Sequence, residues 1–162
     1  MFNQSRAIRI IDSSVYIAIL KVPQHKTFPG QFDEVEQHLE DYIKSNDTLV
    51  LPISTIIETG NHIASAADGR RHKIIELFKR DVLKAYHGEA PYEIAGMNVD
   101  ELLPAWLDLF CNLAGSNIGM GDVICINIYE QYCKIYGSTR EISIWSYDSK
   151  LQGYNSKFHT KT

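Results

Sequence analysis

The chain has 162 residues, which suits one domain with its own buried core better than two domains. Apolar residues make up 44% and charged residues 22%, the proportions of an ordinary folded protein, which excludes a disordered chain. The net charge of −4 excludes a protein that binds nucleic acid through a strong overall positive charge, so any such contact must depend on local basic clusters.

Strand and helix patterns alternate along the first part of the chain. The β-branched residues at 7–11 predict a buried strand, and a helix is predicted at 14–21. A loop at 23–30 leads to a helix at 32–44, in which apolar residues recur at helical spacing. A second strand is predicted at 48–51.

The later part of the chain is predicted to be mainly helical. Pro52 is expected in the first turn of a helix that reaches about residue 67, and a further helix is expected at 72–84. Residues 85–97 contain scattered glycine and proline and are expected to be irregular. The remaining predicted elements are a helix at 99–114, a helix at 122–136, a strand at 142–146 and a loose tail at 154–162.

This alternation predicts an α/β protein with a mainly parallel sheet. The start of the chain lacks the pattern of a signal peptide, and no apolar run approaches the roughly 20 residues of a membrane span. We therefore expect a cytoplasmic protein with no membrane contact. Three cysteines without CxxC spacing predict free, buried thiols in place of a zinc site.

Four acidic residues fall where predicted strands end or helices begin: Asp12, Glu58, Asp122 and Asp148. Each has a local explanation, because the aspartates could cap helices and Thr55 to Glu58 fits a capping box. The carboxyl ends of parallel strands, however, meet at one edge of a sheet, where ligands bind. Carboxylates gathered there repel one another unless a divalent cation lies among them, so the sequence predicts a site for Mg²⁺ or Mn²⁺.

Helical phase supports an inward direction for one of these acids. The polar residues of the helix at 122–136 form a single stripe, and Asp122 lies about 130° from its centre. Glu58 shares a helix face with Ser54 and Asn61, away from the apolar stripe. This polar face suits the wall of a cleft, although simple exposure to solvent explains it equally well.

Four segments together resemble PIN-domain nucleases, in particular the toxin ribonucleases of the VapC type. They are IIDSSVYIAIL (10–20), LPISTIIETGNHI (51–63), GMGDVICINIYEQY (119–132) and ISIWSYDSKL (142–151). The resemblance implies one PIN-like domain over residues 1–162, folded as a Rossmann-like α/β/α sandwich that cleaves RNA phosphodiester bonds. It does not extend to about 85–115, where we expect a helical insertion that differs from the family.

The resemblance also assigns roles. Asp12, Glu58 and Asp122 are implied metal ligands, and Asp148 completes the site. Hydrogen-bonding support is expected from Ser13, Ser146 and Asn61, while Ser14 stands where the family often has asparagine and its role stays open. The basic residues Arg70, Arg71 and Lys73 are candidates for steering the RNA backbone, or else form a solvated helix face.

Partners and rival functions remain open at this point. Members of the VapC type pair with an antitoxin and form homodimers, so both partners are expected by resemblance, and the helix at 99–114 could be core or dimer surface. A PIN-like binding or scaffold module without catalysis is the main alternative. A haloacid-dehalogenase-like phosphatase fits less well, because Ser14 and Ile126 stand where that family has acids. A serine hydrolase lacks its GxSxG motif.

Overall fold

The structure, a computed structural model, describes residues 6–23, 29–66 and 69–156. Its centre is a five-stranded sheet in the order β3-β2-β1-β4-β5, in which β5 is antiparallel to β4 and the other neighbours are parallel. The strands are β1 (Ile8–Ile11), β2 (Thr48–Pro52), β3 (Tyr92–Ala95), β4 (Ile142–Trp145) and β5 (Asn155–Ser156). The predicted mainly parallel sheet is confirmed, as are its strands near 7–11, 48–51 and 142–146.

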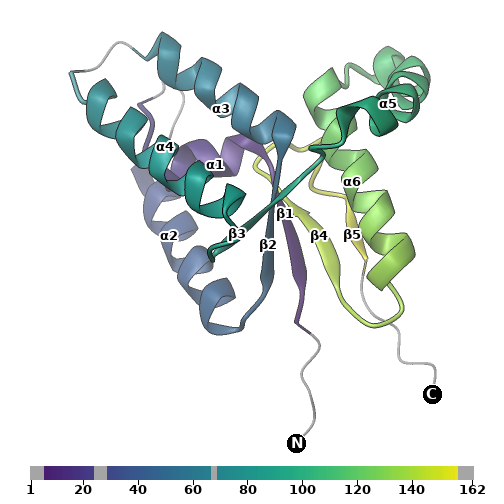
Figure 1. Cartoon of the computed structure of the whole chain (residues 1–162), viewed down its shortest axis with the longest axis horizontal. Coiled ribbons are helices and arrows are strands. Elements are labelled where there is room, and N and C mark those ends of the chain that lie inside the picture. Colours follow the sequence, from purple (N-terminus) through teal and green to yellow (C-terminus); the bar gives the residue numbers. More distant parts are fainter. Residues whose placement is uncertain (1–5, 24–28, 67–68, 157–162) are drawn as a thin grey trace, which may run out of the picture.

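Helices cover both faces of this sheet. They are α1 (Ser13–Ile19), α2 (Pro29–Lys44), α3 (Ile53–Ser65), α4 (Arg71–Tyr86), α5 (Val99–Leu113), the short 3₁₀ helix η1 (Ala114–Ser116) and α6 (Met120–Tyr136). Figure 1 shows α1 to α4 on one side and α5 and α6 on the other. The protein is therefore an α/β fold compatible with a three-layer sandwich.

Alternation along the strands explains the two helical layers. In β2, Leu49 and Leu51 belong to the core shared with α1 and its neighbours, whereas Val50 belongs to the core shared with α6. In β1, Ile8 and Ile10 face the α6 side. Because successive side chains of a strand point to opposite faces, a strand that is apolar throughout needs cover on both sides.

One strand was not predicted. We expected residues 85–97 to be irregular, and this is wrong for β3, which pairs with β2 from Leu49–Tyr92 to Pro52–Ala95. Tyr92 is buried, and its ring meets the ring of Tyr16 edge to face with centroids 5.8 Å apart. The strand thus forms through pairing and burial. Gly96 then ends it with a φ of +83° that favours glycine.

Smaller differences concern element ends. Pro52 is the residue before α3 and not part of its first turn. Asn155–Ser156 of the expected loose tail forms β5, and residues 157–162 of that tail lie outside the described part of the chain. The cysteines are free as predicted and Cys125 is buried, but Cys111 is exposed on α5, where the expectation of a buried thiol is wrong.

Helix α5 contributes to the core on one side. Trp106 is buried, and its indole Nε1 donates a hydrogen bond to Oδ1 of Asn127 on α6, 3.1 Å away. Leu109 packs against the cluster on the α6 face of the sheet. No single helix in the described ranges is long and apolar enough to cross a membrane; the segments 99–116 and 120–136 pass that test only as a sharply bent pair.

Candidate metal centre

Asp12 stands where β1 ends and α1 begins, and only 5% of it is exposed. Its Oδ2 atom accepts hydrogen bonds from the backbone N–H of Ser14 (3.3 Å), the hydroxyl of Ser14 (2.6 Å) and the hydroxyl of Ser146 (2.8 Å). Within the described residues, all the hydrogen bonds to this carboxylate go to Oδ2. The other oxygen, Oδ1, therefore stays available for another ligand.

Two serines join the ends of β1 and β4. The hydroxyls of Ser14 and Ser146 lie 3.3 Å apart. Ser14 Oγ accepts the backbone N–H of Tyr147 (3.0 Å), and Ser146 Oγ accepts the backbone N–H of Asp148 (2.9 Å). The predicted contact of Ser146 with the acids is present, and Ser14, whose role the sequence left open, makes the same kinds of contact from the end of β1.

Glu58 lies in the second turn of α3, which follows β2. The hydroxyl of Thr55 donates to the backbone carbonyl of Ile11 at a distance of 2.7 Å, so it fixes the start of α3 to the end of β1. Thr55 is already inside the helix, and the capping-box explanation for Glu58 is wrong. The carboxylate of Glu58 therefore does not cap the helix. It points to the carboxyl end of the parallel strands, where it forms a hydrogen bond with Ser13.

Gly121 allows Glu58 to reach α6. A Cβ atom placed on Gly121 would lie 1.8 Å from Oε1 of Glu58 and 2.7 Å from its Cδ. No side chain larger than a hydrogen atom fits while the carboxylate keeps this position. The glycine next to Asp122 thus brings α3 and α6 into contact at the acids.

Asp122 and Asp148 complete the set. Asp122 is in the first turn of α6, and its Oδ2 accepts the backbone N–H of Gly119 at 3.0 Å. Asp148 follows β4, and its Oδ1 accepts the backbone N–H of Lys150 at 2.9 Å. Of the three aspartates, only Asp12 is the N-cap of a helix; Gly119 is the N-cap of α6, and Asp148 accepts a hydrogen bond within a turn that no helix follows.

Electrostatic effects of neighbouring charges link the four acids. The pKa of Glu58 is raised by burial and by the charges of Asp12 and Asp122, against the opposing effects of Ser13 and His62. The pKa of Asp122 is raised by burial and by the charges of Asp12 and Asp148, against the opposing effects of Gly119 and Lys150. These residues come from four separate places in the sequence, and folding places them where they repel one another.

The donor chemistry fits a hard divalent cation, since Mg²⁺ and Mn²⁺ prefer carboxylate oxygens. In the part of the chain that the structure describes, however, no three acidic, histidine or cysteine side chains are already positioned to hold a metal ion. Binding would require the carboxylates to turn toward a common point. We expect Asp12 Oδ1 and the carboxylates of the half-buried Glu58 and Asp122 to turn in this way. A cation between them would relieve the repulsion among their negative charges.

A basic residue that the sequence analysis missed lies beside the acids. Lys150 lowers the pKa of Asp122 through its positive charge. Its Nζ atom donates to the backbone carbonyl of Asn117, 2.8 Å away, and so ties the turn after β4 to the turn before α6. Its position two residues after Asp148 was a possible signal, because a residue so near a strand-end acid also reaches the end of the sheet.

The other predicted site residues lie elsewhere. Asn61 is exposed one turn beyond Glu58, and among the described residues no hydrogen bond joins its side chain to the acids. Arg70, Arg71 and Lys73 are exposed around the start of α4, beyond the far end of α3 (Figure 1). The guanidinium of Arg71 donates to the carbonyl of Ala66, so this arginine also secures the end of α3.

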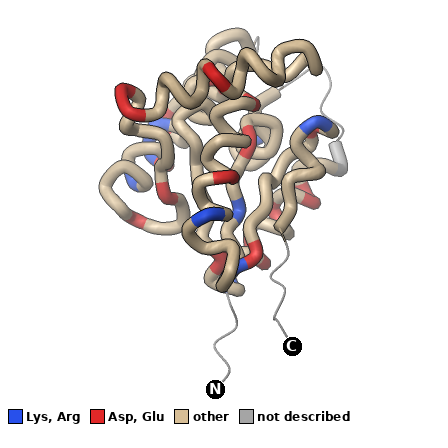
Figure 2. Tube along the Cα trace, turned by 90° about the vertical axis from the view of Figure 1, so that its right-hand side faces the viewer, with Lys and Arg blue, Asp and Glu red and all other residues tan. Residues whose placement is uncertain are grey.

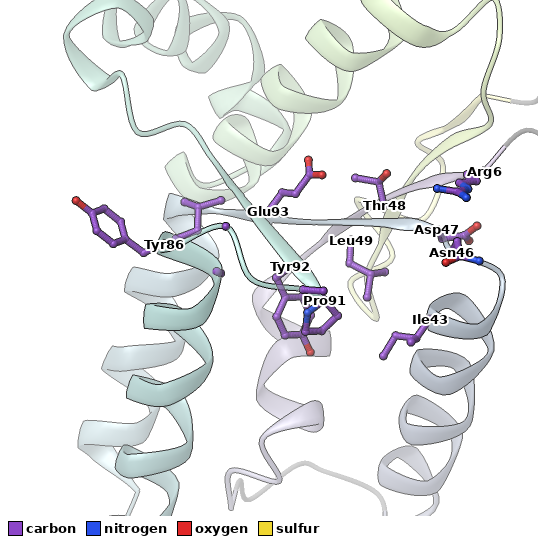
Figure 3. A pocket seen from close by; sticks show the side chains of 14 residues that line it. Arg6, Ile43, Asn46, Asp47, Thr48, Leu49, Tyr86, Pro91, Tyr92 and Glu93 are labelled. Atoms are coloured by element: carbon purple, nitrogen blue, oxygen red, sulfur yellow. The ribbon is translucent and has the colours of Figure 1, made fainter.

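One cavity lies away from the acids. A hollow of about 500 Å³ lies at the opposite end of the sheet, where β2 and β3 begin, and Tyr86, Tyr92, Leu49 and Glu93 are among its lining residues (Figure 3). Asp47, another residue that lines this cavity, is held by the guanidinium of Arg9 at 3.1 Å. Because it lies at the opposite end of the sheet, this cavity is not part of the site that the four acids form.

Comparison of the chain with protein-family models, with curated proteins and with solved structures gave no match. The site is therefore interpreted from its own geometry.

The repulsion among the acids predicts an unusual effect of Glu58→Gln on stability. A carboxyl group whose pKa is raised by folding stabilises the protein below its unfolded pKa, and this contribution is lost as the pH rises through the folded pKa. Without divalent cations at neutral pH, the variant should therefore melt higher than the wild type, by on the order of 2 °C. The difference should shrink as the pH falls below about 4.5.

Thermal unfolding in EDTA between about pH 4 and pH 7.5 measures this difference. Glu130→Gln, which removes an exposed acid on α6, serves as the matched control and should show no such trend. A Glu58→Gln variant that is less stable than the wild type at neutral pH without metal would show that the acids do not repel one another.

Proposed function

We propose that the protein is a metal-dependent ribonuclease with a PIN-like fold, in which Asp12, Glu58, Asp122 and Asp148 bind Mg²⁺ or Mn²⁺. The observation that carries the proposal is the mutual electrostatic effect of carboxylates that come from four different strand ends and helix starts. Structural ion pairs do not explain this arrangement, because neighbouring acidic charges raise the pKa values of Glu58 and Asp122. Groups kept in such a costly arrangement are candidates for function.

The residues have distinct tasks in this proposal. Ser14 and Ser146 fix Asp12 through Oδ2, so that Oδ1 faces the site in one orientation. Gly121 keeps room for the Glu58 carboxylate beside Asp122. The bound cation supplies an acidified water and neutralises charge on the attacked phosphate. Lys150 adds a positive charge next to the acids, where a phosphate group of the substrate needs one.

The reaction that follows is hydrolysis. A water oxygen forms a bond to phosphorus, the bond from phosphorus to the 3′ oxygen breaks, and the leaving oxygen takes up a proton. The products are a 5′-phosphate and a 3′-hydroxyl, as the resemblance to PIN-domain nucleases implies. The choice of RNA as substrate likewise comes from that resemblance, and the acidic net charge makes the cation necessary for binding a polyanion.

A binding or scaffold module without catalysis is the second candidate. One observation favours it: no three of the described side chains are in position for a metal ion. A titration with MgCl₂ distinguishes the two functions. A nuclease site should raise the melting temperature of the wild type in a saturable manner, and a scaffold need not respond.

Removal of metal is expected to abolish RNA cleavage. Purified protein should cut a labelled single-stranded RNA with Mg²⁺ or Mn²⁺ present, lose this activity in EDTA and regain it when excess metal is added back. The ends of the products should be 5′-phosphates. Cleavage that continues in EDTA, or products with cyclic or 3′-phosphates, would contradict the proposal and would indicate a contaminating metal-independent ribonuclease or a different chemistry.

A further inference from the structure

The outer face of α5 carries apolar side chains that have no cover. Val99, Leu103 and Leu107 are 42%, 42% and 48% exposed, and their spacing of four residues places them on one side of the helix. Trp106, about 60° round the helix from the centre of these three residues, is buried against Asn127. The apolar side of α5 therefore continues from the core into solvent, and its exposed part offers a surface for another protein.

The charge around this face has one sign. Residues 85–133 contain seven acidic residues and no lysine or arginine, so all 16 basic residues of the chain lie elsewhere. On α5 itself, Asp100, Glu101 and Asp108 are exposed. Figure 2 faces the side of α5 and α6, and acidic positions prevail over the elements there.

Helical geometry places one acid at an edge of the apolar stripe. At about 100° per residue, Val99, Leu103 and Leu107 span roughly 80° of the helix surface. Asp100 lies about 20° beyond Leu107, whereas Asp108 and Glu101 lie about 100° and about 120° beyond it, on the remaining solvent-facing side of the helix. The other edge of the stripe borders the face that packs on α6.

We propose that this outer face of α5, formed by Val99, Leu103, Leu107 and the adjoining Asp100 within a surface that Glu101 and Asp108 make acidic, binds an amphipathic helix of a partner protein with lysines or arginines along one edge of its apolar side. The apolar stripe would bury the leucines and valine, and the acids would select a basic partner by charge. The inference is independent of the proposed nuclease activity.

Two other occupants fit less well. A second copy of the chain, placed by a twofold axis on the same face, would bring one acidic surface without lysine or arginine against another. Nucleic acid would meet a surface without basic residues, and its phosphates would be repelled. A basic amphipathic helix would both bury the apolar side chains and bring positive charges to the acidic residues.

Two labelled synthetic helices test the proposal on the full-length protein by fluorescence anisotropy. Both have about 18 residues and the same leucine stripe, and they differ only in having lysine or glutamate along one edge. The lysine helix should bind at least about tenfold more tightly than the glutamate helix, and added salt should weaken it. The triple variant Asp100→Asn/Glu101→Gln/Asp108→Asn should reduce this preference to less than about twofold.

The apolar part of the surface is tested with a matched pair of variants. Leu103→Asp/Leu107→Asp should weaken binding of the lysine helix by at least about tenfold. Ile43→Asp/Leu83→Asp changes residues of similar exposure, 46% and 45%, on the other side of the sheet and should leave binding unchanged. Thermal unfolding checks that both variants stay folded, which is expected because all four side chains are exposed.

Three results would overturn the inference. The first is equal binding of the lysine and glutamate helices, and the second is equal loss of binding in the α5 variant and its control. The third is a concentration-dependent dimer of the wild type, seen by analytical ultracentrifugation, that Leu103→Asp/Leu107→Asp dissociates. That dimer would assign the face to a second copy of the chain.

Discussion

Asp12→Asn is expected to lower the rate of metal-dependent RNA cleavage by at least about a hundredfold. Asp12 is the most deeply buried of the four acids, and its charge acts on both Glu58 and Asp122. The amide keeps the size of the side chain and can still accept a hydrogen bond from Ser14, but it removes one of the negative charges that would hold the cation. Single-turnover cleavage with excess enzyme measures the rate.

A matched control separates a local from a general effect of this substitution. Asp41→Asn removes an exposed carboxylate of α2 that accepts a hydrogen bond from Gln37, and it should retain full activity. Melting curves with and without MgCl₂ add a second readout, because Asp12→Asn should lose most of the stabilisation by Mg²⁺. An Asp12→Asn protein that cleaves RNA at the wild-type rate would refute the assignment of these acids.

Gly121→Ala is expected to reduce cleavage by roughly ten- to a hundredfold with only a small change in stability. The added Cβ would lie 1.8 Å from Oε1 of Glu58, so the carboxylate must move away from its position beside α6. The fold tolerates this movement, since the atom that must move is the end of a flexible side chain. Alanine also favours the helix over glycine by about 1 kcal/mol, which offsets part of the cost.

Two further variants make this test specific. Gly115→Ala adds the same methyl group in η1, where nothing lies within 4 Å of the new atom, and it should be fully active. Glu58→Asp in the Gly121→Ala background shortens the acid and should recover part of the lost activity. Unchanged activity of Gly121→Ala would mean that the position of the Glu58 carboxylate does not matter for the reaction.

Much of the fold could be predicted because β1, β2 and β4 are short β-branched or apolar runs between helical patterns. The strand β3 was missed for a physical reason. Tyr92-Glu93-Ile94-Ala95 has only a weak local preference for a strand and lies between Pro91 and Gly96. Its conformation depends on pairing with β2 and on burial of Tyr92, and neither is visible in the local sequence.

The gathering of the four acids could be predicted because parallel strands place their carboxyl ends at one edge of the sheet, independently of the contacts that the side chains make there. The residues that support the acids could not be predicted in this way. Ser14 and Lys150 act through contacts between the ends of distant elements, and Gly121 matters only because α3 approaches α6 at that residue. The placement of Arg71 also depends on a tertiary contact, since its guanidinium donates to the end of the preceding helix.

The order of the strands in the sheet has a consequence for folding of the protein during its synthesis. The central strand β1 can pair with β2 once residue 52 has been synthesised, but its other neighbour, β4, follows only after residues 53–141. Asp12 can accept the hydrogen bond from Ser146 only when β4 has left the ribosome and inserted beside β1. A growing chain therefore already contains Asp12, Glu58 and Asp122 before the segment that supplies Asp148 exists, and the acidic centre is completed only when β4 is in place.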